Sequence, residues 1–423
     1  MLKTEIKNAY VSILKEELIL ATGCTEPIAM AYAAAKLREI LGTEPEKIYG
    51  EISGNIIKNV KSVVVPNTGG LKGIQAAIAA GIVAGKADQQ LQVIASVPDK
   101  LYPAIRAYVE KTPMEIICAQ TPYLLDIMLT GCAGNHKAVV RIANNHTNVV
   151  CIEKDGCVIL EKEMIESSED GLTDKSLLNL EDILEFAGTV ELSEIEDVIE
   201  RQIRYNTAIA EEGLKNDWGA NIGSTLLEVY GDDVRVKARA WAAAGSDARM
   251  SGCEMPVVIN SGSGNQGMTT SLPVICYAEH LKKTREELCR ALVVSNLVTA
   301  YQKAGIGRLS AYCGAISAGV GSGAAIAYLK GADYDGIAHT IMNAVAILSG
   351  TICDGAKPSC AAKIAEAVDA GILGYEMYLR GGNFKSGEGI VGRDITEAVR
   401  NVGILATEGM QGTDRTILKI MTK

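Results

Sequence analysis

Two cysteines flank a loop-like segment rich in glycine and proline. Residues 353–360 read CDGAKPSC, so six residues separate Cys353 from Cys360. A loop lets two thiolates turn towards one metal centre, whereas residues seven apart on a helix lie about 10 Å apart along its axis. The spacing is wider than that typical of a zinc site. The segment therefore predicts either two thiolate ligands or two buried thiols that flank a turn.

Cys313 and Cys24 each stand where a turn meets a helix-like segment. Cys313 precedes an Ala- and Gly-rich run, a setting that is also typical of a close-packing cysteine. Cys24 lies in ATGCTEPIA (21–29), where Pro27 suits the first turn of a helix. A thiol at a helix N-terminus can have a lowered pKa and act as a nucleophile or base. The alternative for this turn is a simple N-cap formed by Thr25.

A third segment, NSGSGNQG at 260–267, follows the strand-like run 255–259 and precedes a stretch that can form a helix. Its backbone N–H groups and serine hydroxyls can hold a carboxylate at a helix N-terminus. It lacks the full dinucleotide-binding pattern and the Lys-Ser/Thr ending of a P-loop. The segment therefore predicts an anion site or, as the alternative, a flexible turn.

Two lysines are further candidates for contacts with a substrate. Lys303 lies in YQKAG, and Lys357 lies between the paired cysteines. Each is a candidate to contact a carboxylate or a leaving group, and each can equally be a solvated lysine. The histidines show no ligand spacing, and we expect all four to be structural or exposed: His136, His146, His280 and His339.

The composition excludes several classes of function. The 423-residue chain has a net charge of −10 and only 4% aromatic residues, so it offers no general attraction to phosphate backbones or anionic membranes and few stacking platforms. No apolar run reaches the roughly 20 residues that cross a bilayer, and nothing reads as a signal peptide. We therefore expect a cytoplasmic protein with a small-molecule substrate and no nucleic-acid or membrane partner. A homodimer is the expected assembly.

The elements that must position these segments fall into two groups. Helical periodicity occupies 5–20, the run opened by Pro27, and almost everything after residue 176. Between them, Asp155-Gly156 is a hairpin signal. The same region contains short β-rich runs at 48–52, 60–65, 137–143, 148–152 and 157–160.

The predicted fold class is α+β. We expect a mostly helical domain of residues 1–45 and 163–423, with a smaller α/β-type domain of residues 46–162 inserted between its two parts. The polar, acidic stretch 161–176 predicts a linker.

Taken together, these segments closely resemble the single-chain L-cysteine desulfidase family, relatives of the iron–sulfur L-serine dehydratases (alpha-chain-like). The resemblance spans essentially the whole chain. It implies that Cys313, Cys353 and Cys360 hold an oxygen-sensitive [4Fe–4S] cluster in the helical domain, which an aerobic preparation can lose, and that Cys24 is the catalytic base. The serine dehydratases carry a cysteine near the C-terminus, whereas this chain ends without a thiol, which favours the desulfidase.

The resemblance implies a β-elimination that needs no pyridoxal phosphate. The turns at 22–25 and 261–266 would hold the substrate carboxylate, while the fourth iron acts as a Lewis acid towards the β-substituent. Cys24, or another group such as Lys303, would remove the α-proton. L-Cysteine would then yield sulfide, pyruvate and ammonia. The residues expected to bind substrate are Thr22, Thr25, Ser261, Ser263, Asn265, Gln266 and Lys357.

Three alternatives remain open at this point. The same cluster would also serve an L-serine dehydratase. A non-catalytic iron–sulfur redox sensor is a second alternative, although it would leave the substrate-like turns without a purpose. A pyridoxal-phosphate lyase would need a Schiff-base lysine and a phosphate cup, and the sequence offers no persuasive pair.

Overall fold

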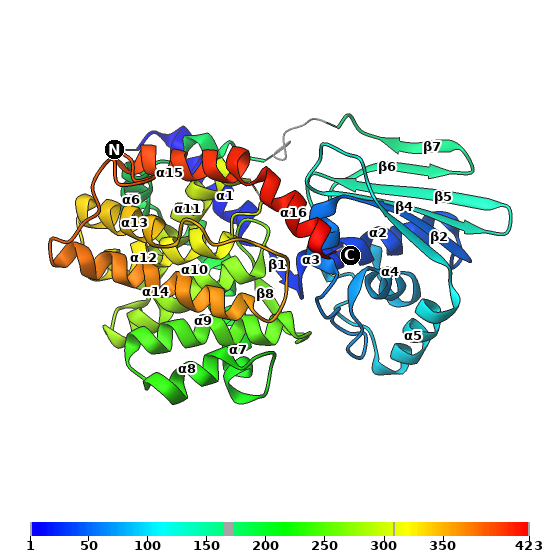
Figure 1. The fold of residues 1–423 in the computed structure, drawn as a ribbon, viewed down its shortest axis with the longest axis horizontal. Coiled ribbons are helices and arrows are strands. Elements are labelled where there is room, and N and C mark those ends of the chain that lie inside the picture. The colour runs from blue at the N-terminus through cyan, green and yellow to red at the C-terminus, as the bar shows by residue number, and fades with distance from the viewer. Residues whose placement is uncertain (1, 165–171, 308, 422–423) are drawn as a thin grey trace.

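A computed structural model describes residues 2–164, 172–307 and 309–421, and it has a helical lobe and a smaller lobe built on a six-stranded sheet (Figure 1). This arrangement confirms the predicted α+β class. The predicted linker at 161–176 lies partly outside the described residues.

The sheet is antiparallel apart from one parallel pair, β2 with β3, and its strand order is β3-β2-β4-β5-β6-β7. At the β6–β7 turn, Asp155 and Gly156 have φ values of 51° and 81°, which confirms the predicted hairpin turn. The strands are β2 (Lys47–Ile52), β3 (Met114–Cys118), β4 (Asp126–Ala133), β5 (His136–Ala143), β6 (Val149–Lys154) and β7 (Cys157–Glu161).

The strand predicted at 60–65 is wrong. Helix α3 (Gly54–Val60) ends there, and the following residues form a turn in which Val63 and Val65 are buried. β-Branched residues favour buried positions, and β-propensity largely reflects such burial. The buried turn therefore has the composition of a strand without forming one.

Helix α2 (Thr25–Leu41) packs on strands β4 and β5, and α4 (Gly73–Ala84) packs on α2, with α5 (Tyr102–Lys111) beyond it. The contact of α2 with α4 is very close, since a Cβ added to Gly81 would lie 2.1 Å from the carbonyl oxygen of Ala31. The two-domain division stays a prediction, and the packing of α2 on the sheet favours a boundary before this helix instead of at residue 45.

The helical lobe surrounds α10 and α12, two almost wholly buried helices. Helix α1 agrees with the helix predicted at 5–20, and no helix within the described ranges is long and apolar enough to cross a membrane. The helices are α1 (Thr4–Glu17), α6 (Leu180–Thr189), α7 (Glu196–Lys215), α8 (Ile222–Tyr230), α9 (Val234–Met250), α10 (Gly264–His280), α11 (Arg285–Ile306), α12 (Gly314–Leu329), α13 (Tyr334–Leu348), α14 (Cys360–Leu379), α15 (Ile395–Ile404) and α16 (Gln411–Met421).

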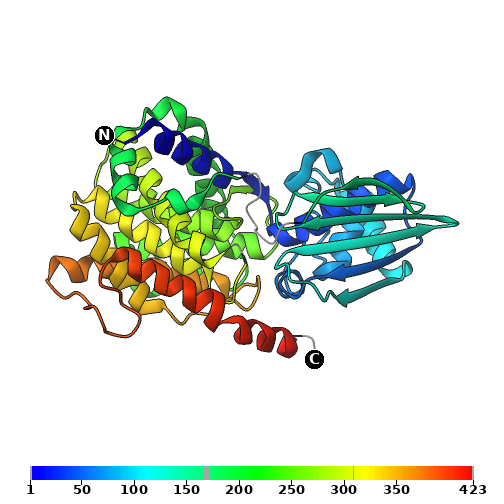
Figure 2. The same cartoon turned by 90° about the horizontal axis from the view of Figure 1, so that it is seen from above.

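Two connections join the lobes near the predicted functional segments. Strand β1 (Leu20–Thr22) pairs with β8 (Pro256–Val258), which confirms the strand-like run at 255–259 and brings the turn before α2 close to the segment 260–267. Helix α16 extends from the helical lobe to the sheet lobe (Figure 2), where Asp414 accepts a 2.5 Å hydrogen bond from the buried Lys58.

Helices α12 and α14 cross at glycines, so that their backbones touch. A Cβ on Gly319 would lie 2.3 Å from the carbonyl oxygen of Ala367, and a Cβ on Gly323 would lie 2.6 Å from the Cα of Gly371. Because α12 begins directly after Cys313 and α14 begins at Cys360, this crossing helps to set the positions of two of the predicted ligands.

We therefore predict that Gly319→Ala lowers the free energy of unfolding by about 1–3 kcal/mol, because the added methyl group forces the two helices apart. Gly188→Ala is the matched control: Gly188 lies in helix α6 with open space around it, and alanine there should be neutral or stabilising by up to about 1 kcal/mol. Denaturant titration measures both changes. Equal stability of the two variants would contradict the close crossing.

Candidate active site

A cavity of about 100 Å³ lies between the lobes, at the ends of several helices. Its wall includes the first turns of α2, α10, α12 and α14, the last turns of α9 and α11, and part of α3. Eight of the residues singled out in the sequence line it, namely Cys24, Ser263, Asn265, Gln266, Lys303, Cys313, Cys353 and Cys360. Segments far apart in the chain therefore meet in one place.

Backbone hydrogen bonds hold the cysteine-bearing loops together. The N–H of Cys353 donates to the carbonyl of Ala311 at 2.7 Å, and the N–H of Cys313 donates to the carbonyl of Thr351 at 3.1 Å. Cys313 is the N-cap of α12, and Cys360 is the first residue of α14. Two of the three thiols thus stand at helix N-termini, where the helix dipole favours negative charge.

The three thiols influence one another electrostatically. Burial and, to a smaller extent, the neighbouring Cys353 raise the pKa of Cys313 to about 12. Burial and Cys353 likewise raise the pKa of Cys360. Thiolates placed together in such a site need a positive centre beside them, and bound iron supplies one.

The donor set fits a cluster better than it fits a single metal ion. No group of three His, Cys, Asp or Glu side chains in the part of the chain that the structure describes is arranged to hold one ion. In an iron–sulfur cluster each cysteine binds a different iron, so the thiols need not converge on one point. Three cysteines on one cavity match a four-iron cluster with one iron left open.

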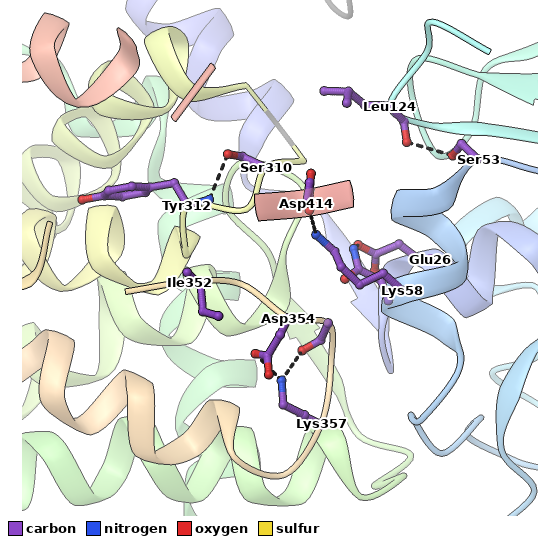
Figure 3. A network of polar contacts seen from close by, with 12 residues as sticks. Glu26, Ser53, Lys58, Leu124, Ser310, Tyr312, Ile352, Asp354, Lys357 and Asp414 are labelled. Atoms are coloured by element: carbon purple, nitrogen blue, oxygen red, sulfur yellow. Dashed lines mark hydrogen bonds and ion pairs between the residues drawn. The ribbon is translucent and has the colours of Figure 1, made fainter. Parts of the chain in front are cut away.

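Lys357 braces the loop between the paired cysteines and does not line the cavity. It forms an ion pair with Asp354 (Figure 3), whose Oδ1 also accepts a 2.6 Å hydrogen bond from Lys363. Burial acts to raise the pKa of Asp354, but the two lysines outweigh it and lower the pKa to about 2. The substrate contact expected of Lys357 stays a prediction.

Three further predicted substrate-binding residues also lie outside the cavity wall. Thr22 lies in the β1–β8 ladder, Thr25 donates to the carbonyl of Gly262 at 2.9 Å, and Ser261 donates to Asn260 Oδ1 at 2.8 Å. The hydroxyl groups of Thr25 and Ser261 thus stabilise the two turns, because buried hydroxyl groups must find partners within the fold. Direct binding of substrate by Thr22, Thr25 and Ser261 stays a prediction.

Cys24 lines the cavity, but its environment differs from the one predicted. It is the N-cap of α2, and its Sγ donates to Glu26 Oε2 at 3.1 Å. Burial and the Glu26 charge raise the pKa of the Cys24 thiol well above its ordinary value, although Arg249 acts in the opposite direction. The lowered pKa expected from the helix N-terminus is therefore wrong, because desolvation and a neighbouring carboxylate outweigh the dipole.

Glu26 is a cavity residue that the sequence analysis missed. Its Oε1 accepts a 3.0 Å hydrogen bond from Asn59 of α3, so both carboxylate oxygens have a partner. Burial acts to raise its pKa, but the charge of the buried His146 and the bond from Cys24 help to lower it. An acidic residue in a first turn is common at any helix N-terminus, so no specific signal in the sequence distinguishes Glu26.

Two cationic residues also line the cavity. Lys303 lies in the last turn of α11 and is 6% exposed, so its predicted place at the site agrees with the structure. Arg249 lies in the last turn of α9 and was missed, because its helix is otherwise rich in alanine and carries no recognisable motif. Both positive charges therefore lie among the thiols.

Comparison with known proteins identifies similar chains. Residues 110–419 match the family model described as serine dehydratase alpha chain. The UPF0597 protein of Desulfitobacterium hafniense is 56% identical over 98% of this chain and 96% of its own length. The UPF0597 protein of Lachnoclostridium phytofermentans is 51% identical over 97% of this chain and 98% of its own length. That of Treponema denticola is 46% identical over 98% of this chain and 97% of its own length.

The contact between Cys24 and Glu26 generates a prediction about reactivity. Glu26→Gln removes a negative charge beside the thiol, so the pKa of Cys24 falls and its thiolate fraction at pH 8 rises, by roughly tenfold for each pKa unit. Alkylation of Cys24 by iodoacetamide, followed by peptide mass spectrometry, should become faster. The exposed Cys118 is the internal control and should react at the same rate in both proteins. Slower or unchanged alkylation of Cys24 would contradict this assignment.

Proposed function

Because the chain belongs to the serine dehydratase alpha-chain family, which is associated with iron–sulfur clusters and amino-acid β-elimination, we propose that it is a lyase that converts L-cysteine to pyruvate, ammonia and sulfide. The observation that carries this proposal is the meeting of four thiols in one cavity. Three of them come from loops and helix N-termini, and the fourth, Cys24, is bonded to a carboxylate. The reaction needs no pyridoxal phosphate.

We assign the cluster to Cys313, Cys353 and Cys360, which would hold a [4Fe–4S] group through three of its irons. When bound, such a group supplies a Lewis acid that makes the β-substituent a better leaving group. The protein's own part is to keep the loops in place and to limit the access of water. The backbone bonds between the loops and the Asp354–Lys357 pair serve the first purpose.

The assignment of the α-proton acceptor also follows from the chain itself. Cys24 rests as a thiol, so it becomes a base only as its own proton moves to Glu26 Oε2, 3.1 Å away. Cys24 and Glu26 then act as a pair that relays one proton away from the substrate. Lys303, which lines the same cavity, is the alternative acceptor.

L-Serine is the second candidate substrate, because the matching family is described as a serine dehydratase. The two substrates differ in the β-heteroatom, which is sulfur in L-cysteine and oxygen in L-serine. The homodimer expected from the sequence stays a prediction.

The ligand assignment predicts the outcome of anaerobic purification. Replacing Cys313, Cys353 or Cys360 singly by alanine should lower iron and acid-labile sulfide and abolish turnover, because each thiol binds its own iron. Cys253→Ala is the control: this buried cysteine lies outside the cavity wall and should keep full iron content. Full iron retention in all three cavity variants would refute the assignment.

The role given to Cys24 predicts a different pattern. Cys24→Ser should keep the iron and the cluster absorbance but lose most of kcat, because a serine hydroxyl is a far weaker acid and does not relay a proton to Glu26 at neutral pH. Pyruvate and sulfide release from L-cysteine measures turnover. Loss of iron from Cys24→Ser would show that Cys24 is a cluster ligand. Full turnover by this variant would show that another group, such as Lys303, accepts the α-proton.

A further inference from the structure

Arg249 carries a buried positive charge whose hydrogen-bonding capacity is only partly used by the described residues. Its side chain is 2% exposed, Nη1 donates to Asn265 Oδ1 at 3.1 Å, and Nε has no hydrogen-bond partner among the residues described. The charge of Arg249 helps to lower the pKa of the nearby Glu26, but Glu26 accepts its hydrogen bonds from other groups, Cys24 and Asn59 among them. A buried guanidinium is costly unless an anion binds it, so this residue is suited to an anionic ligand.

The fold keeps a specific place for this guanidinium at the start of α10. A Cβ added to Gly264 would lie 2.4 Å from Arg249 Nε and 2.7 Å from Cζ, so only glycine leaves room for it there. The first N–H groups of a helix have no partner within the helix. An anion bound by Arg249 would therefore meet the guanidinium group and a helix N-terminus together, and a carboxylate matches this combination.

A second unpartnered group in the same cavity has the opposite polarity. Gln266 is 5% exposed, and its Oε1 has no hydrogen-bond partner in the described residues. Its amide packs on Gly314, where an added Cβ would lie 2.6 Å from Nε2 and 3.0 Å from Oε1. The acceptor is thus fixed beside Cys313, and it is suited to a donor such as an ammonium group.

From these two groups we infer that Arg249 binds the α-carboxylate, and Gln266 Oε1 the α-ammonium group, of a free α-amino acid. A buried donor pair and a buried acceptor on one small cavity complement a zwitterion and discriminate against ligands that lack either charge. This inference rests on the proposed function, because it names the residues that select the substrate class at that site. Peptides, amides and hydroxy acids are excluded as good substrates.

L-Alanine is the probe for this inference, because it has both charged groups but no leaving group and so tests recognition without turnover. Isothermal titration calorimetry on the full-length protein should show binding of L-alanine that is roughly 10- to 100-fold tighter than binding of L-alaninamide or L-lactate. The amide lacks the carboxylate, and the hydroxy acid lacks the ammonium group.

The variants should separate the two contacts. Arg249→Gln should weaken L-alanine by roughly 10- to 100-fold and leave L-alaninamide unchanged, whereas Gln266→Met should weaken L-alanine and leave L-lactate unchanged. Arg249→Lys keeps the charge but loses the paired donors, so it should bind L-alanine with intermediate affinity even if Arg249→Gln does not fold. Arg235→Gln is the control on the same helix, because this exposed arginine pairs with Asp369 and should leave every affinity unchanged.

Equal loss of L-alanine and L-alaninamide in Arg249→Gln, unchanged L-alanine binding in that variant, or no binding of L-alanine by the wild-type protein would overturn the inference. If the ligands bind in the expected order but the protein does not turn over L-cysteine, the assignment of Arg249 and Gln266 stands and the proposed function is refuted. If Arg249→Gln turns over L-cysteine with an unchanged KM, the proposed function stands and the assignment of Arg249 is refuted.

Discussion

Three thiols on one cavity, one of them buried and two half-buried, impose the constraint on which the rest of this structure depends. Burial already disfavours a thiolate, and a neighbouring thiolate disfavours it further, so the pKa of Cys313 and that of Cys360 are both raised. Under the proposed function a positive centre would bind the sulfurs and favour their thiolate forms, and the loops that carry them must then be held in place. Backbone bonds between the loops and an ion pair within one of them provide this rigidity.

The small residues of the chain have a direct purpose in this account. Glycines at the crossing of α12 and α14 let two cysteine-bearing helices approach until their backbones touch, and Gly264 makes room for a guanidinium. The cavity also needs the sheet lobe, which supplies Cys24, Glu26 and Asn59, and a Cβ on Gly355 would lie 2.4 Å from the Lys58 carbonyl. The scarcity of aromatic residues noted in the sequence is consistent with packing of this kind.

The sequence predicted the parts of the site that lie in recognisable motifs. The α+β class and the hairpin at Asp155-Gly156 follow from local patterns. The meeting of the cysteine segments with 263–266 was implied only by the resemblance to a known family, because no local pattern specifies which distant segments pack together. Glu26 and Arg249 were missed because a single charged residue in a helix has no signature of its own, and its function depends on which distant segments pack around it. The pKa of Cys24 was predicted in the wrong direction for the same reason, since burial and Glu26 outweigh the helix dipole.

Iron-edge anomalous diffraction from crystals grown without oxygen tests the central claim most directly, because it locates the iron relative to each sulfur. The account predicts a compact group of iron sites bonded to Cys313, Cys353 and Cys360, with one iron free of protein ligands and Cys24 Sγ still bonded to Glu26. Iron bonded to Cys24, or a protein that contains no iron at this cavity after anaerobic purification, would contradict it.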